Sequence, residues 1–278
     1  MTPLEINALM TSLEGRPELI ETHISFVILA GEFAYKIKKP VKFSFLDFST
    51  LQKREECCRR ELQLNRRLAS EIYLDVVPVC KNGEAFFVCE AETEIGTAVD
   101  YAVKMKRLDA NLEMDRMLSK GRINSEYLKV LARKIADFHR GAAVIRATSQ
   151  SNPSNYKADF EDILVQTPVF ERLLGSTAKE RLEKVVEASA HYLETHADLI
   201  QQRLLDGCIR DLHGDLHSRN IFAYPDPVVF DCIEFNDHFR QIDVLNEVAF
   251  LCMDLEAQGF PELSATFMAA YFAEMKAM

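Results

Sequence analysis

The sequence predicts an α+β fold in which the strands come first along the chain and the helices follow. Short runs rich in β-branched and aromatic residues, each bounded by turn residues, are concentrated before residue 109. Apolar residues at three- and four-residue intervals, the spacing of amphipathic helices, dominate from Met114 onward. With 278 residues, 48% of them hydrophobic, the chain can bury a substantial core. We therefore expect a small antiparallel β part up to about residue 104 and a mainly helical part after it.

The first strands are predicted to follow a short N-terminal helix. Residues 4–13 carry apolar side chains at near-helical spacing, and β-prone runs at 24–29 and 33–38 flank the turn residues Gly31 and Glu32. This pattern predicts a hairpin. In its second strand Lys36 and Lys38 alternate with apolar residues, so both lysines lie on one face. From the pattern alone, that face could be solvated or could bind a ligand.

A helix is predicted over about residues 51–68, because Ser49 or Thr50 can cap its start. Glu61 lies near the middle of this helix, and an ordinary ion pair within the helix is one role open to it. The helix offers many charged residues for pairs four positions apart, namely Glu55, Glu56, Arg59, Arg60 and Arg66. A second hairpin is predicted from residue 76 to residue 89 around the Asn82–Gly83 turn. A strand over residues 101–108 follows and leads into the helical part.

The helical part is predicted from apolar periodicity. A buried helix is expected over about residues 127–139 and a long amphipathic helix over about 178–205, with a polar loop at 148–155 between them. Two more apolar helices are expected over about 240–251 and 265–278. Asp243 either caps the first of these or braces the polar segment before it.

The composition narrows the cellular setting and the partners. The seven cysteines are odd in number and show no Cys-x-x-Cys spacing, which predicts reduced, mostly buried thiols rather than disulfides or a zinc site. No apolar run approaches the roughly 20 residues that span a bilayer, and the N-terminus lacks a signal-peptide pattern. We therefore expect a cytoplasmic protein with no membrane partner. The net charge of −10 argues against a nucleic-acid partner.

Chemically capable polar residues gather between residues 211 and 236. Asp215, Asn220 and Asp231 are separated by five and eleven residues, with turn residues and short β-prone runs between them. Phosphoryl transfer to a hydroxyl needs such a set. One Asp orients the hydroxyl and accepts its proton, while the Asn and the other Asp hold Mg²⁺ on the phosphates. The protein-kinase signature has the same order of residues.

Two segments in this region, His213–Asn220 and Phe230–Phe235, resemble the aminoglycoside phosphotransferase-like branch of the protein-kinase-like fold, in which His-Gly-Asp replaces His-Arg-Asp. Most of the chain also resembles a bacterial group within that family whose members are often fused to a C-terminal P-loop ATPase domain. Four segments carry this closer resemblance: Glu21–Ser25, Tyr35–Pro40, Phe45–Ser49 and Asp231–Asn236.

The resemblance implies a two-lobed protein-kinase-like fold. Its small antiparallel-β N-lobe, the nucleotide-binding lobe, would span residues 1–104, its hinge 105–109, and its mainly helical C-lobe with the catalytic loop 110–278. Lys36, or as second choice Lys38, would contact the phosphates of ATP, and Glu61 would hold that lysine in place. Met105 and Leu108 would meet the adenine.

The resemblance leaves some positions less defined. His213 is expected to brace the catalytic loop, and Glu234 could assist a second metal ion or bond to the backbone. No Gly-x-Gly-x-x-Gly loop precedes the first hairpin. Thr22, His23 and Ser25 occupy that turn. Either their hydroxyl and amide groups act as donors to phosphate, or the segment is an ordinary polar turn.

The function predicted from the sequence is ATP- and Mg²⁺-dependent transfer of the γ-phosphate to a hydroxyl of a small molecule, such as an aminoglycoside, a sugar or an amino alcohol. Asp215 would be the catalytic residue, with Asn220 and Asp231 as metal ligands. The alternatives are a protein Ser/Thr kinase and a non-catalytic ATP-binding regulatory module serving a P-loop ATPase partner domain. No Gly-x-x-x-x-Gly-Lys-Ser/Thr motif occurs in this chain, so we expect either a stand-alone or a shortened version of the group.

Overall fold

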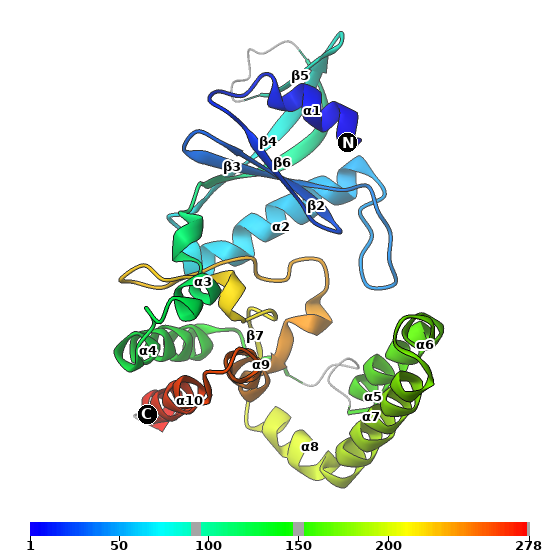
Figure 1. Cartoon of the computed structure of the whole chain (residues 1–278), viewed down its shortest axis with the longest axis vertical. Helices are drawn as coiled ribbons and strands as arrows, with labels where there is room; N and C mark the ends of the chain where they lie inside the picture. The colour runs from blue at the N-terminus through cyan, green and yellow to red at the C-terminus, as the bar shows by residue number, and fades with distance from the viewer. Residues whose placement is uncertain (90–95, 147–152, 277–278) are drawn as a thin grey trace. The chain divides into compact units, whose positions relative to one another are not determined.

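The computed structural model describes residues 1–89, 96–146 and 153–276 of the chain. A six-stranded antiparallel sheet occupies the first part of the sequence, with the strand order β1-β2-β3-β6-β4-β5 (Figure 1). Its strands are β1 (Glu18–Glu21), β2 (Ser25–Ala30), β3 (Phe33–Lys38), β4 (Tyr73–Asn82), β5 (Ala85–Val88) and β6 (Thr97–Lys106). The predicted α+β class, with antiparallel strands first and helices after them, is confirmed.

Two hydrophobic clusters, one on each face of the sheet, join it to its helices. Helix α1 (Pro3–Met10) contributes Leu9 to one cluster, and α2 (Leu51–Ala69) contributes Cys58 to the other (Figure 1). Ala34 of β3 belongs to the cluster that contains α2. Because side chains alternate along a strand, Lys36 and Lys38 share the face of Ala34 and point toward α2.

Helix α2 begins where the sequence predicts. The hydroxyl of Thr50 accepts a hydrogen bond from the backbone N–H of Lys53 at 3.3 Å and so caps the first turn. Its buried positions recur at three- and four-residue intervals but are unusually polar for a core-facing stripe. They are Arg54, Cys57, Cys58, Glu61, Asn65 and Ala69. A polar stripe on the face toward the sheet indicates that α2 carries charged groups for a site as well as packing surface.

Helices and one short hairpin follow the sheet in the larger compact unit, which comprises residues 1–141, 212–240 and 246–278. Helix α4 packs along α10 in this unit (Figure 1). Between them in sequence, a two-stranded hairpin follows the polar loop that begins at His213. The elements are α3 (Met114–Ser119), α4 (Ser125–Gly141), β8 (Ile221–Phe222), β9 (Val228–Val229), α9 (Val244–Ala257) and α10 (Pro261–Lys276). The predicted lobe boundaries remain predictions.

The smaller unit comprises residues 142–211 and 241–245. In the part of it that the structure describes, it contains four α-helices, a 3-10 turn at Ile163–Gln166, and the antiparallel pair of β7 (Ile209–Asp211) with β10 (Gln241–Asp243). The helices are α5 (Pro153–Asp162), α6 (Thr167–Leu174), α7 (Ser176–Thr195) and α8 (Ala197–Leu205). Asp243 accepts a hydrogen bond from the N–H of Leu245 at 2.8 Å and pairs with Arg203, so it acts as a cap at the start of α9.

Two details of this unit depart from the sequence prediction. The single helix predicted over 178–205 is wrong, because it divides at His196 into α7 and α8. The His196 ring donates to the carbonyl of Tyr192 at 2.9 Å, and the His196 backbone leaves the helical region with ψ at 17°. Of the loop predicted over 148–155, residues 148–152 lie outside the described residues, and 153–155 begin α5.

The prediction that all cysteines are free thiols is also wrong. Cys80 and Cys89 form a disulfide, with their Cα atoms 6.1 Å apart. Strands β4 and β5 pair antiparallel, and the N–H of Cys89 donates to the carbonyl of Pro78, which brings the two cysteines within the range a disulfide spans. Sequence spacing does not reveal this hairpin register. The other five cysteines are free, and four of them are buried.

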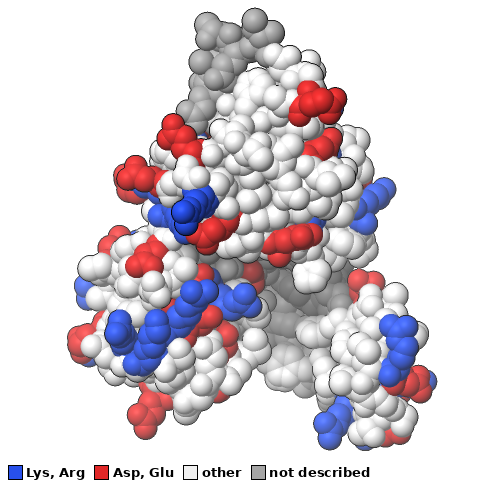
Figure 2. All heavy atoms as spheres, turned by 45° about the horizontal axis from the view of Figure 1, so that its top comes forward, with Lys and Arg blue, Asp and Glu red and all other residues white. Residues whose placement is uncertain are grey.

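The distribution of surface charge and the hydrophobicity of the helices relate to the predictions about nucleic-acid and membrane partners. On the face drawn in Figure 2, acidic and basic side chains are interspersed, and neither sign covers the face. Among the residues that the structure describes, no helix combines the length and the hydrophobicity that crossing a membrane requires.

Candidate active site

The loop at His213 and Gly214 has a conformation that only a glycine accommodates at its second position. Gly214 has φ +86°, and a Cβ atom there would lie 2.6 Å from the carbonyl oxygen of Phe239. The His213 ring accepts a hydrogen bond from the N–H of Asp215 at Nδ1 (3.2 Å) and donates from Nε2 to the carbonyl of Phe230 (2.9 Å). Burial lowers its pKa, so the ring is neutral and braces the loop.

The buried carboxylate of Glu247 also holds the backbone of this loop. Oε1 of Glu247 on α9 accepts hydrogen bonds from the backbone N–H groups of His213 and Gly214, both at 2.8 Å. Its Oε2 accepts a hydrogen bond from Nε2 of His139 at 2.7 Å, and Nδ1 of His139 lies 2.8 Å from the hydroxyl of Tyr271. Burial alone would raise the pKa of Glu247, but the bonds with His139 and the loop amides lower it. The loop backbone is therefore fixed by charge-assisted hydrogen bonds.

Asp215 and Asn220 lie against each other in this loop. The side-chain amide of Asn220 donates both to the backbone carbonyl of Asp215 (3.0 Å) and to its Oδ2 (2.9 Å). The Nε2 atom of His217 lies 3.4 Å from the same Oδ2. Burial would raise the pKa of Asp215, but the neighbouring His217 and the bond from Asn220 hold it below its ordinary value. Asp215 is therefore a carboxylate, and its Oδ1 can accept a proton from an incoming hydroxyl.

Asp231 has a backbone conformation that is rare for its residue type. It has φ +65°, and among the described residues it is the one non-glycine with a positive φ. Two side chains, Tyr73 from β4 and Asn65 from α2, form hydrogen bonds to the backbone of this turn. The N–H of Asp231 donates to the hydroxyl of Tyr73 at 3.1 Å, and the N–H of Cys232 donates to Oδ1 of Asn65 at 2.9 Å. Such a costly conformation persists only where the surroundings enforce it, and it is typical of functional sites.

Lys36 links Asp231 to helix α2. Its ammonium group donates to Oε1 of Glu61 at 2.8 Å and to Oδ1 of Asp231. Burial would lower the pKa of Lys36, but the two carboxylates raise it well above its ordinary value. The Lys36 ammonium in turn opposes the effect of burial on Asp231 and lowers its pKa. The Asp231 side chain is 39% exposed, so this pair is open to solvent at one end.

Lys38 is fully buried between two carboxylates. It donates to the second oxygen of Glu61, Oε2, at 2.5 Å and to Oε1 of Glu234. A solvated strand face is therefore excluded for both lysines. We call the five side chains of Asp231, Lys36, Glu61, Lys38 and Glu234 the charge network. Among the hydrogen bonds that the structure describes, Glu234 bonds to Lys38 and not to the backbone. Its carboxylate also accepts a hydrogen bond from the Cys57 thiol.

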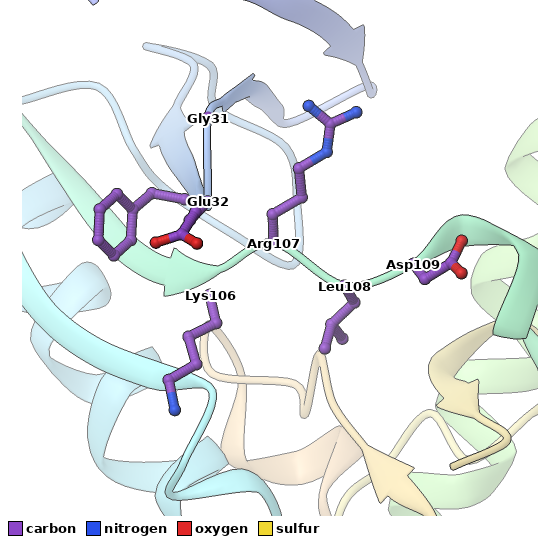
Figure 3. Close-up of a pocket in the computed structure, with 7 residues that line it drawn as sticks. Gly31, Glu32, Lys106, Arg107, Leu108 and Asp109 are labelled. Carbon is purple, nitrogen blue, oxygen red and sulfur yellow. The ribbon is translucent and has the colours of Figure 1, made fainter. Parts of the chain in front are cut away.

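The segment predicted as the hinge borders a pocket. An open pocket of about 680 Å³ is lined by Gly31–Phe33 and Lys106–Asp109, and Figure 3 shows Lys106 and Leu108 on one side of the chain and Arg107 on the other. The N–H groups of Lys106 and Arg107 donate to the carbonyls of Ile72 and Glu32. Within the described residues, the N–H of Leu108 has no acceptor. Met105 is buried in the sheet core instead of lining the pocket.

Side chains of the protein already form hydrogen bonds with the turn between β1 and β2. The hydroxyl of Thr22 accepts a hydrogen bond from the N–H of Ser25 at 2.9 Å, and the ammonium of Lys39 donates to the carbonyl of Thr22 at 2.5 Å. Ser25 pairs with Lys38 across the strands. Among the described residues, its hydroxyl is the one buried side-chain polar atom without a hydrogen bond. A role of this turn in binding phosphate remains a prediction.

The donor set at the site fits a hard cation. The side-chain Nδ2 of Asn220 donates both of its hydrogen bonds to Asp215. The Oδ1 atom of Asn220 is therefore the atom that can ligate a metal. Asp231 has a partly exposed carboxylate. The residue before it, Phe230, donates from its N–H to the carbonyl of Asn220 at 3.1 Å, so the backbones of the two candidate ligands are linked. Among the described residues, no three His, Cys, Asp or Glu side chains form a metal cluster. One carboxylate, one amide oxygen and ligand phosphates suit Mg²⁺.

The geometry agrees with a comparison of the sequence with family models. The model described as the phosphotransferase enzyme family matches residues 44–278, which include Glu61, Asp215, Asn220 and Asp231. The chain belongs to this family. The predicted resemblance is confirmed at that level, and the enzyme class of the family is phosphotransferase. The finer features, namely the acceptor, the nucleotide and the metal ion, are proposals.

Curated relatives of this phosphotransferase-family chain are longer proteins. Uncharacterized proteins of Mycobacterium tuberculosis and Mycobacterium bovis are each 31% identical over 254 residues, which cover 90% of this chain and 48% of theirs. The chain therefore spans about half the length of these relatives. Among solved structures, a choline/ethanolamine kinase family protein from Mesorhizobium loti aligns with 13% identity and a TM-score of 0.45, covering 93% of this chain and 70% of that one.

The structure brings the site residues predicted from the sequence into two groups. One group is the set Lys36, Lys38, Glu61 and Asp231, and the other is the pair Asp215 and Asn220. Sequence reasoning missed the supporting residues Asn65, Tyr73 and Glu247. For Glu247 the sequence does contain a signal, because it is the one charged residue in the mainly apolar stretch from Val244 to Leu251. A buried acid in such a helix needs a specific partner.

Proposed function

We propose that this chain catalyses ATP- and Mg²⁺-dependent transfer of the γ-phosphate to a hydroxyl group of a small molecule. The observation that carries the proposal is the position of Lys36, which joins Glu61 of α2 to the partly exposed carboxylate of Asp231. Protein kinases use a strand lysine, a helix glutamate and a metal-binding aspartate in this relation. Membership of the phosphotransferase enzyme family supports the same reaction class.

Asp215 acts as the base in the proposed reaction. Its lowered pKa keeps it ionised, and the hydrogen bond from Asn220 to Oδ2 fixes the carboxylate so that Oδ1 is available to the acceptor. A hydroxyl bound at Oδ1 is oriented toward the phosphate and loses its proton to Asp215 as the new P–O bond forms and the bond to the ADP oxygen breaks. The neutral, buried His213 keeps the loop in place without exchanging protons.

Lys36, Asn220 and Asp231 handle the phosphates. Asp231 and Oδ1 of Asn220 would hold Mg²⁺, which would neutralise the charge that develops on the phosphates. Lys36 would exchange its bond to Asp231 for one to a phosphate oxygen while it keeps its bond to Glu61. Lys36 is the better candidate for this than Lys38, because Lys36 pairs with the exposed carboxylate and Lys38 is fully buried.

The hinge segment would bind the adenine. The N–H of Leu108 has no acceptor within the described residues, whereas the N–H groups of the two residues before it are used by the sheet lobe. Leu108 is thus suited to donate to a ring nitrogen of adenine. Met105 would contribute only apolar support from the sheet core.

A phosphotransfer assay with a panel of acceptors tests the proposal. Purified protein is incubated with Mg²⁺, γ-labelled ATP and one candidate acceptor at a time, chosen from aminoglycosides, sugars and amino alcohols. A parallel reaction contains a protein mixture as the acceptor. We expect label in a low-molecular-weight product with at least one acceptor and its loss in the Asp215→Asn variant. Label only in protein would contradict the small-molecule acceptor. Wild-type protein that neither binds nor turns over ATP would contradict the function itself.

A further inference from the structure

The second lysine of β3, Lys38, has no role in the proposed reaction, yet it is the more deeply buried of the two. Lys38 is fully buried, and so are its partners Glu61 and Glu234. Placing three charged groups in the interior carries a large desolvation penalty, which their mutual attraction offsets only when the geometry is good and the remaining polar atoms are bonded. Apolar residues at both position 38 and position 234 would avoid burying two of these charges. The arrangement therefore calls for an explanation other than fold stability alone.

Glu61 divides its carboxylate between the two lysines. Oε1 accepts from Lys36 at 2.8 Å and Oε2 accepts from Lys38 at 2.5 Å. Lys38 continues to Glu234, which lies three residues after Asp231 on the same segment. The charge network is thus a chain of contacts whose two ends, Asp231 and Glu234, belong to one short stretch of backbone. Lys36 occupies the solvent-facing side and Lys38 the interior side.

These contacts give the two lysines different consequences when nucleotide binds. If Lys36 leaves Asp231 for a phosphate, as the proposed function requires, Glu61 keeps one fixed partner in Lys38. The segment after Asp231 also keeps its tie to β3, because the bond of Lys38 to Glu234 is unaffected. Without Lys38, the carboxylate of Glu61 would lose the partner that fixes its Oε2, and it could rotate with Lys36.

We infer that Lys38 and Glu234 are positioning residues, which hold Glu61 and the Asp231 segment in place while Lys36 exchanges Asp231 for a phosphate of the nucleotide. This inference rests on the proposed function, and it assigns a second ion pair to the same site. Neither residue touches the substrate. Their effect is to fix the distance between the phosphate-binding lysine and the metal-binding carboxylate.

The chain provides a matched control on the same helix. Arg54, seven residues before Glu61 on α2, is buried and donates from Nε to Oδ1 of the buried Asp100 at 2.9 Å. Asp100 also accepts a bond from the amino group of Met1 at 2.9 Å. This pair joins α2 to β6, as the pair of Lys38 with Glu61 joins α2 to β3, but it does not contact Lys36 or Asp231 in any bond that the structure describes.

Four variants separate positioning from stability. Glu234→Gln keeps the shape of the side chain and removes its charge, and Lys38→Met removes the other charge. The double variant leaves Lys36 with the buried Glu61 and the partly exposed Asp231. Asp100→Asn is the control. For each, thermal unfolding, kcat and KM for ATP at saturating Mg²⁺, and the affinity for ATP by calorimetry are measured at a temperature where the variant is folded.

We expect the single variants at 38 and 234 to raise KM for ATP by about 10- to 100-fold, the range found for residues that orient metal or phosphate ligands indirectly. The double variant recovers thermal stability, because no buried charge is left alone, but its KM for ATP stays high. Asp100→Asn lowers the melting temperature and leaves KM unchanged.

Two results would overturn the inference. One is a KM for ATP in Glu234→Gln and Lys38→Met that equals the wild-type value while the melting temperature falls as in Asp100→Asn. The other is recovery of both stability and KM in the double variant, which indicates a purely structural pair. Both results leave an active wild-type enzyme, whereas an inactive wild type contradicts the proposed function and this inference with it.

Discussion

Two buried ion networks lie on helix α2, and they differ in how they end. At the Arg54 end, Asp100 is fully buried and both of its carboxylate oxygens are bonded within the protein, Oδ1 to Arg54 and Oδ2 to the amino group of Met1. At the Glu61 end, the charge network finishes at Asp231, whose side chain is 39% exposed. The first network is closed by protein groups, and the second opens toward solvent.

The charges of the two networks differ as well. When its groups are ionised, the charge network has two lysines and three carboxylates, so its net charge is 2 − 3 = −1. The network at Arg54 has two cationic groups and one carboxylate, and it carries no excess negative charge. Surplus negative charge with an exposed carboxylate suits a site that receives a cation. The difference supports our proposal that the same kind of ion pair is structural at one end of α2 and serves the reaction at the other.

The largest expected effect comes from removing the base beside the open network. Asp215→Asn keeps the size of the side chain but cannot accept the proton of the acceptor hydroxyl, so kcat should fall by about 10²- to 10⁴-fold. ATP affinity, measured by calorimetry, should stay within a few-fold of wild type, because Asp215 contacts Asn220 and His217 rather than Lys36. Unchanged phosphate transfer in this variant would remove Asp215 from the mechanism.

The closed network should affect stability only. Asp100→Asn leaves Arg54 buried without its carboxylate partner, and breaking a buried pair in this way costs about 3–5 kcal/mol. We expect a lower midpoint in chemical unfolding, with kcat and KM unchanged for the folded enzyme. A change in KM for ATP as large as that of a variant in the charge network would show that the two ends of α2 are not functionally distinct.

The smallest expected effect concerns the pH dependence at Asp215. His217 helps to lower the pKa of Asp215, and Asp215 in turn raises the pKa of His217 against the effect of burial. Because the base must be ionised, His217→Gln should move the acid limb of the kcat profile to higher pH. An acid limb at the same pH in both proteins would contradict the contact. His217→Asn gives a second variant with a shorter side chain.

The same pair makes a prediction for stability. The lowered pKa of Asp215 contributes stability above about pH 4, its ordinary range, and this is lost as the pH falls through the lower folded value. The raised pKa of His217 contributes stability below about pH 6.5, and this is lost as the pH rises through the higher folded value. Wild type should therefore exceed His217→Gln in melting temperature mainly between these limits, by a small amount because both side chains are partly exposed.

Local patterns were enough to predict the fold class and the elements that carry the site. Turn residues placed the hairpin of β2 and β3, and alternation put Lys36 and Lys38 on one face. A cap residue placed the start of α2. The spacing of Asp215, Asn220 and Asp231 depends on one loop and one short hairpin, so it is also local information.

What the sequence did not reveal depends on contacts between distant segments. The bond of Lys38 to Glu234 joins residues 196 positions apart, and that of Tyr73 to Asp231 joins residues 158 apart. The disulfide of Cys80 and Cys89 required the register of β4 against β5. The break at His196 is local instead: the His196 ring bonds to the carbonyl of Tyr192, four residues earlier, where the apolar periodicity gives no sign of a helix end. Such features follow from packing, and no periodic pattern encodes them.

The central claim, that the open end of the charge network receives a metal–nucleotide complex, is tested most directly by calorimetric titration of ATP with and without Mg²⁺ into wild type and Asp231→Asn. We predict that Mg²⁺ strengthens ATP binding to wild type, and that Asp231→Asn loses about 10- to 100-fold of that Mg²⁺-dependent affinity, because Asp231 is the exposed carboxylate of the network. The Asp100→Asn variant, from the closed network, should titrate as wild type. Equal Mg²⁺ dependence in wild type and Asp231→Asn would contradict the account.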